Sequence, residues 1–132
     1  MSREVELHRY LAEVSGRPFE PGQHDCALFA AGWVDRVCGT QLVAKWQGRY
    51  YSLPEGRKML RRNGIHNLRG LAEAQLDCVG GWAFCQPGDV ALIRQHTLCF
   101  GIVGSGGLIH CLQAVRGLDV LPISRAWRVY RP

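Results

Sequence analysis

The stretch that decides the fold of this chain reads Gln23-His24-Asp25-Cys26-Ala27-Leu28-Phe29-Ala30-Ala31-Gly32-Trp33-Val34-Asp35-Arg36-Val37-Cys38-Gly39. A polar loop ends at Asp25, and an apolar run with helical spacing begins directly after it. Asp25 is expected to cap the helix, because an N-cap carboxylate accepts hydrogen bonds from the unpaired amides of the first turn. Gly39 is expected to end it, since glycine readily adopts the left-handed C-cap conformation. The stretch therefore predicts a helix that begins at Cys26.

The apolar residues of this helix fall on or near one stripe, which predicts that the helix is buried. They are Leu28, Phe29, Ala31, Val34 and Val37. A thiol at a helix N-terminus lies at the positive end of the macrodipole, which lowers its pKa and raises the thiolate fraction. Cys26 is therefore a candidate nucleophile. The alternative is that Cys26 packs as a small buried hydrophobic residue at a helix start.

Length and composition predict one globular domain, residues 1–132, with 47% hydrophobic and 20% charged residues. The net charge of +5 rests on 16 basic against 11 acidic residues, and the only lysines are Lys45 and Lys58. This balance suits acidic partners such as nucleic acid or an anionic cell wall. The opening segment has mixed charge, so no signal peptide is expected. No apolar run approaches the length of about 18 residues that a membrane span needs.

Helical patterns occupy the first half of the chain and strand patterns the second. Helices are expected over residues 3–14, from Cys26, from the capping box at Ser52 to Asn63-Gly64, and after Asn67. Residues 77–86 are expected to form a loop. The period changes at Pro87-Gly88, and strands are expected over residues 89–93, 97–103, 108–112, 118–123 and 126–130. Helices followed by an antiparallel meander predict an α+β fold in which the Cys26 helix packs on the sheet.

Six cysteines raise the question of metal or disulfide sites: Cys26, Cys38, Cys78, Cys85, Cys99 and Cys111. None forms a C-x-x-C pair, so a metal site is not expected, and Cys78 with Cys85 is the one pair worth examining. Disulfides are not the default without an export signal. The apolar neighbours of Cys38, Cys99 and Cys111 predict that these three are reduced and mostly buried.

Three short motifs resemble the NlpC-type cell-wall peptidases, which belong to the papain-like thiol hydrolases. The matching segments are Asp25-Cys26 at the helix start, Pro87-Gly88-Asp89-Val90-Ala91-Leu92, and Gly101-Ile102-Val103-Gly104 followed by Leu108-Ile109-His110. A small group of this family is encoded beside phage tail genes, and the middle segment resembles it at Trp46-Gln47-Gly48-Arg49-Tyr50 and Arg61-Arg62-Asn63-Gly64. The resemblance implies a papain-like/NlpC-type fold with Cys26 as the nucleophile.

One departure from the family pattern bears directly on catalysis. The family places its general-base histidine two residues before the Gly-Ile pair, and here that position is Cys99. A thiol cannot replace an imidazole as base and then acid near neutral pH. His96 could serve from the start of the strand, or His110, which matches the residue that orients the base, could itself pair with Cys26. His24 is expected to be a loop residue that tunes the local potential.

Two functions follow from this resemblance. In the first, the chain is a degenerate, structural protein of a phage or phage-like tail tip that binds other tail or hub proteins; Cys99 favours this reading. In the second, it is an active cysteine peptidase that cleaves peptidoglycan stem peptides without metal or cofactor, with Cys26 attacking and His110 or His96 shuttling the proton. Either implies a location in the virion after assembly in the bacterial cytoplasm. Nucleic-acid binding is a distant third, because the basic helix is its only cue.

Overall fold

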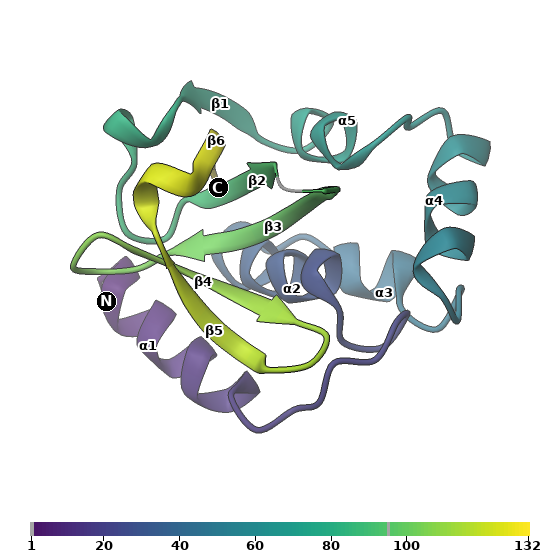
Figure 1. Ribbon diagram of the computed structural model, residues 1–132, viewed down its shortest axis with the longest axis horizontal. Helices are drawn as coiled ribbons and strands as arrows, with labels where there is room; N and C mark the ends of the chain where they lie inside the picture. Colours follow the sequence, from purple (N-terminus) through teal and green to yellow (C-terminus); the bar gives the residue numbers. More distant parts are fainter. Residues whose placement is uncertain (1, 95) are drawn as a thin grey trace.

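The sheet lies at the centre of the molecule. A computed structural model describes residues 2–94 and 96–132. Across these residues the chain forms a six-stranded sheet in the order β1-β6-β2-β3-β4-β5, with every pair antiparallel. The strands are β1 (Asp77–Gly80), β2 (Val90–Arg94), β3 (Leu98–Val103), β4 (Leu108–Gln113), β5 (Gly117–Pro122) and β6 (Ala126–Arg131). The predicted α+β class is confirmed, and β2 to β5 form the expected meander, while β6 returns to lie beside β2 (Figure 1).

Helices α1 (Arg3–Val14) and α2 (Cys26–Cys38) cover one face of the sheet. Their bounds agree with the predicted ones, and Gly39 ends α2 in the left-handed conformation as expected. The core of this face includes Phe29, Trp33 and Leu92, each fully buried. The indole of Trp33 donates to the carbonyl of Gly88 at 2.7 Å, so α2 is fixed to the turn before β2.

The buried side of α2 differs in part from the predicted stripe. Trp33 is completely buried although the stripe omitted it, whereas Ala31 is only half-buried. The prediction that Cys38 is buried is wrong: it is exposed, because the last residue of α2 lies beyond the part of the helix that contacts the sheet. Cys99 is half-buried and Cys111 is buried, and all six cysteines carry free thiols.

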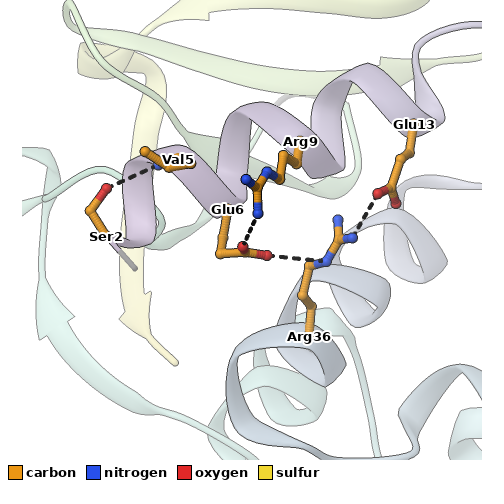
Figure 2. Close-up of polar contacts among 6 residues, drawn as sticks. All are labelled: Ser2, Val5, Glu6, Arg9, Glu13 and Arg36. Atoms are coloured by element: carbon orange, nitrogen blue, oxygen red, sulfur yellow. Dashed lines mark hydrogen bonds and ion pairs between the residues drawn. The ribbon is translucent and has the colours of Figure 1, made fainter.

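A polar network joins the outer surfaces of α1 and α2 (Figure 2). The guanidinium of Arg36 lies 2.7 Å from Glu13 and 3.7 Å from Glu6, and Arg9 pairs with Glu6 at 3.1 Å. These side chains are at least a quarter exposed, so the contribution of each pair to stability is small. The buried contacts between the two helices and the sheet therefore supply most of the stability.

Three short helices form an arm between α2 and β1, away from α1 (Figure 1). They are α3 (Leu42–Trp46), α4 (Leu53–Arg62) and α5 (Leu68–Glu73). The predicted caps are present, with Ser52 accepting from the Glu55 amide at 3.2 Å and Asn67 from the Gly70 amide at 2.9 Å. Helix α3 was not expected, because its cap lies outside its own sequence: the Asp35 carboxylate on α2 accepts from the amides of Leu42 and Val43.

The second face of the sheet is covered by the two short 3₁₀ segments η1 (Trp82–Phe84) and η2 (Ile123–Arg125) and the residues around them. The prediction that residues 77–86 form a loop is wrong in part, because residues 77–80 form β1 and pair with β6. The fully buried Asp89 carboxylate pairs with Arg131 of β6, at 2.8 Å to Nη2 and 3.0 Å to Nε. Asp89 of the Pro87-Gly88-Asp89 segment therefore links β6 to the start of β2.

Candidate functional site

Asp25 is the polar centre of the candidate site. Its carboxylate is 1% exposed and accepts hydrogen bonds from the Leu28 amide at 3.0 Å, the Gly22 amide at 3.0 Å and the phenol of Tyr50. The first bond is the predicted N-cap. The other two attach the loop before α2 and the segment after α3 to the same carboxylate. Burial and the hydrogen bond to Asp25 raise the pKa of Tyr50 far above its ordinary value, so the phenol remains protonated and donates.

The loop that precedes Cys26 lies directly against the segment that follows α3. Gly22 has a φ of +81°, and a Cβ built on it would lie 1.8 Å from the Tyr50 carbonyl oxygen. Only glycine fits so close an approach in this conformation. The Gly22 carbonyl accepts from the Gly48 amide at 2.8 Å. Asp25 and Gly22 thus fix the position at which Cys26 starts α2.

Cys26 lies where β3 and β4 separate. The pairing of these strands ends at Gly101 with Cys111. The Gly104 amide donates to Leu108 on the β4 side, and the alternation of the strand directs the Phe100 amide to that side as well. With β4 no longer paired there, the amides of Phe100 and Ala27 donate to the Cys26 sulfur. The thiol therefore occupies a position at the end of the β3–β4 ladder.

The protonation state of Cys26 is the reverse of the predicted one. Burial raises its pKa to about 12, and the two amide hydrogen bonds lower it by less than burial raises it. The expectation of a thiol activated by the helix macrodipole is therefore wrong for the folded chain. The macrodipole effect is small beside the cost of forming an anion where protein replaces water. Near neutral pH Cys26 is a neutral thiol.

His110, the partner predicted for Cys26, contacts a different part of the sheet. It pairs with Ile102 and faces the side of the sheet that α1 and α2 cover, as its strand position predicts. Its Nε2 lies 2.5 Å from where a Cβ on Gly104 would be. Gly104 is four residues along β3 from Phe100, about 13 Å at strand spacing. Burial, and then the neighbouring His8, lower the His110 pKa. The structure does not bring His110 and Cys26 together.

The other two histidines named from the sequence, His96 and His24, form no hydrogen bond with Cys26. His96, the second candidate base, is exposed in the turn between β2 and β3. His24 is 5% exposed, and its Nε2 has no hydrogen-bond partner among the described residues. Burial lowers the His24 pKa, and Arg17 adds to that effect, so the ring is held neutral. It packs with its edge toward Phe29 and serves the core rather than the thiol.

A comparison with protein families identifies the chain over nearly its whole length. A family model described as a domain of unknown function, DUF6950, matches residues 2–131. The chain belongs to the DUF6950 family. No curated protein matches this DUF6950 domain significantly.

Beside Cys26 the DUF6950 domain contains a cavity of about 440 Å³. It lies between α2 and β3 on one side and the α4–α5 arm on the other, and Cys99, the residue at the expected base position, also borders it. Burial raises the pKa of Cys99 to about 11, so it cannot act as a base near neutral pH. Among the described residues His66 is the one histidine that lines the cavity. It is exposed before α5, and no sequence pattern marked it.

Two further features of the DUF6950 domain bear on cofactors and membranes. Within residues 2–94 and 96–132, no group of three or more His, Cys, Asp or Glu side chains is arranged to hold a metal ion. Cys78 is exposed and Cys85 half-buried. Over the same residues, every helix is too short or too polar to cross a bilayer. The site as a whole offers a neutral thiol, a fully engaged carboxylate and an apolar cavity.

Proposed function

We propose that this chain is a tail-tip component of a phage or phage-like particle whose NlpC-type peptidase fold has lost catalysis and acts structurally. The observation that carries the loss of catalysis is the geometry around Cys26, where Cys99 occupies the position expected for the base and borders the same cavity. In the described part of the chain no histidine forms a hydrogen bond with the sulfur, and burial raises the pKa of the thiol. A thiol nucleophile needs a base in hydrogen-bond reach or a lowered pKa, and Cys26 has neither.

The tail-tip assignment rests on the sequence motifs. The geometry at Asp25 explains why one of these motifs is present in a chain that has lost catalysis. Asp25-Cys26 is retained although the base position holds Cys99, and Asp25 has a structural role that accounts for its presence. It holds three donors from three segments, so replacing it would disturb the loop, the helix and Tyr50 together. A residue of that kind persists in a fold whether or not the neighbouring thiol reacts.

Hydrolysis of purified peptidoglycan tests the loss of catalysis. The expected result is that wild-type protein and Cys26→Ala release the same background of muropeptides, measured by liquid chromatography and mass spectrometry. Release that disappears in Cys26→Ala would contradict the proposal and favour the active cysteine peptidase. In that case His66→Ala, His96→Ala and His110→Ala would identify the base.

The location is tested separately on purified particles. Mass spectrometry should detect the chain in particles at a few copies each, and immunogold labelling should place it at the tail end that meets the cell. Its absence from intact particles would contradict the tail-tip assignment whatever the outcome of the hydrolysis assay.

A further inference from the structure

The cavity beside Cys26 is a feature of the candidate site that the proposed function does not use. Its volume of about 440 Å³ lies in the range of small-molecule sites, about 300–1,000 Å³. Its walls come from both helices and strands, and they include the apolar side chains of Ala31 in α2, Met59 in α4, Leu71 in α5 and Leu98 in β3. Such a lining favours an apolar ligand, because polar groups buried against it would lack hydrogen-bond partners.

The inner part of the cavity carries no available charge. Asp25 borders it, but its carboxylate is occupied by the Gly22 amide, the Leu28 amide and the Tyr50 phenol. Cys26 and Cys99 contribute thiols that burial holds neutral. A peptidoglycan stem peptide, with amides and carboxylates along its length, would be poorly matched to this interior.

The solvent-exposed border of the cavity, its mouth, includes a cationic side chain. Arg57 on α4 and His66 before α5 both line it, and both are exposed. Arg57 forms no ion pair with any described residue. A guanidinium in this position is suited to hold a carboxylate through paired hydrogen bonds. The cavity therefore combines an aliphatic interior with a cationic entrance.

We propose that this cavity binds a long-chain fatty acid, with the alkyl chain along Leu71 and Leu98 and the carboxylate at Arg57. The alkyl chain of this ligand would contact apolar side chains, and its carboxylate would contact a guanidinium. Its binding requires no reaction at Cys26. The proposal is independent of where the protein is located in a particle. It concerns a single fatty acid molecule rather than a membrane surface or a second protein.

Titration with cis-parinaric acid, whose fluorescence rises in apolar surroundings, measures binding of a fluorescent fatty acid. Displacement of this probe by oleate then measures the affinity for an ordinary fatty acid. Ala31→Leu places extra side-chain volume in the cavity and should weaken binding at least about tenfold, equivalent to about 1.4 kcal/mol. Ala12→Leu is the matched control, because Ala12 is an exposed α1 residue outside the cavity, and it should bind as wild type. Thermal unfolding of both variants shows that each is folded.

The charge at the mouth is tested without changing the interior. Arg57→Glu should weaken the binding of oleate about tenfold and leave the binding of methyl oleate unchanged. Lys58→Glu, on the same helix but outside the cavity, should alter the binding of neither ligand.

Three binding results would overturn the proposal: no saturable binding of cis-parinaric acid, equal binding by Ala31→Leu and wild type, or binding to anionic vesicles with none to free oleate. A dimer in light scattering that Ala31→Leu dissociates would likewise show that a second copy, and not a fatty acid, fills the cavity.

Discussion

The phenol of Tyr50 donates a hydrogen bond to the buried carboxylate of Asp25, joining the segment after α3 to the residue that caps α2. Tyr50 is 7% exposed and Asp25 1% exposed, so neither group can exchange its partner for water. A buried acceptor that loses a donor costs more than an exposed one, because its desolvation is no longer compensated. The contact therefore links the stability of the arm to that of the Cys26 helix.

Tyr50→Phe should lower the free energy of unfolding by about 1–3 kcal/mol, because it removes the donor and leaves the Asp25 carboxylate one partner short. Urea unfolding followed by circular dichroism measures the change. Tyr51→Phe is the matched control, since Tyr51 is 75% exposed and should change stability by less than about 0.5 kcal/mol. Equal effects of the two substitutions would contradict the structural role of the Asp25 contact.

Gly22→Ala should destabilise the protein by about 3 kcal/mol or more. The new Cβ would meet the Tyr50 carbonyl oxygen at 1.8 Å, and the φ of +81° adds strain for any residue with a side chain. Gly16→Ala is a suitable comparison, because a Cβ at Gly16 has no atom within 4 Å and its φ is not positive. Thermal unfolding of both variants tests the prediction, and a Gly22→Ala protein as stable as Gly16→Ala would refute the close approach.

Cys26 should resist alkylation over the pH range in which ordinary thiols react. Its pKa of about 12 leaves almost no thiolate at pH 8, whereas the exposed Cys78 is open to solvent. Iodoacetamide labelling followed by peptide mass spectrometry should therefore modify Cys78 first and Cys26 much more slowly, although Cys26 is only half-buried. Rapid labelling of Cys26 at pH 7 that His110→Ala abolishes would restore the catalytic pair predicted from the sequence.

The same pKa has a consequence for stability that can be measured at alkaline pH. The folded-state pKa of Cys26 lies above the ordinary value of 9.0, so its contribution is complete below pH 9 and is lost as pH rises toward about 12. The difference in unfolding free energy between wild type and Cys26→Ala should therefore change by about 1 kcal/mol in favour of the variant between pH 8 and 10. A difference that stays constant over this range would show that the sulfur ionises as readily in the folded chain as in the unfolded one.

Arg131→Gln should cost about 3 kcal/mol of stability, because it leaves the fully buried Asp89 without its counter-ion. Arg116→Gln removes an ion pair with Asp119 whose arginine is 76% exposed, and it should change stability by less than about 1 kcal/mol. Chemical denaturation of both variants at low and high salt measures the contrast. If the two substitutions had equal effects, Asp89 would not depend on Arg131.

Local patterns in the sequence were sufficient to predict elements whose determinants are contiguous. Asp25, Ser52 and Asn67 each cap a helix through an amide three residues away, so a short stretch of sequence contains both partners of the bond. Helix α3 is capped by Asp35, seven residues before Leu42 on another helix, and strand β1 depends on β6, about 50 residues later, so the usual local patterns reveal neither. For the same reason the α2 stripe missed Trp33, whose burial depends on the turn at Gly88.

The same difference between local and long-range determinants applies to the candidate site. The sequence indicated that Cys26 begins a helix, and this is confirmed. The pKa of its thiol depends on how much protein surrounds the sulfur, which is a property of the arm and of β3 rather than of the helix. His110 lies on the expected face, but the direction in which its ring leans is set by the space above Gly104. Residue type and spacing predict where a helix starts and which face of a strand a residue occupies, whereas proximity, burial and side-chain direction require the assembled fold.

The position of β6 in the sheet determines the order in which the sheet can be completed. Strand β1 has β6 as its one partner, and β6 lies between β1 and β2. During synthesis β2 to β5 can pair as successive hairpins, but residues 77–80 must wait until residues 126–131 have left the ribosome. A nascent chain that stops before residue 126 therefore has Asp89 without its counter-ion and β2 with an open edge. The sheet is therefore completed only when β6, which follows the other five strands in sequence, enters between β1 and β2.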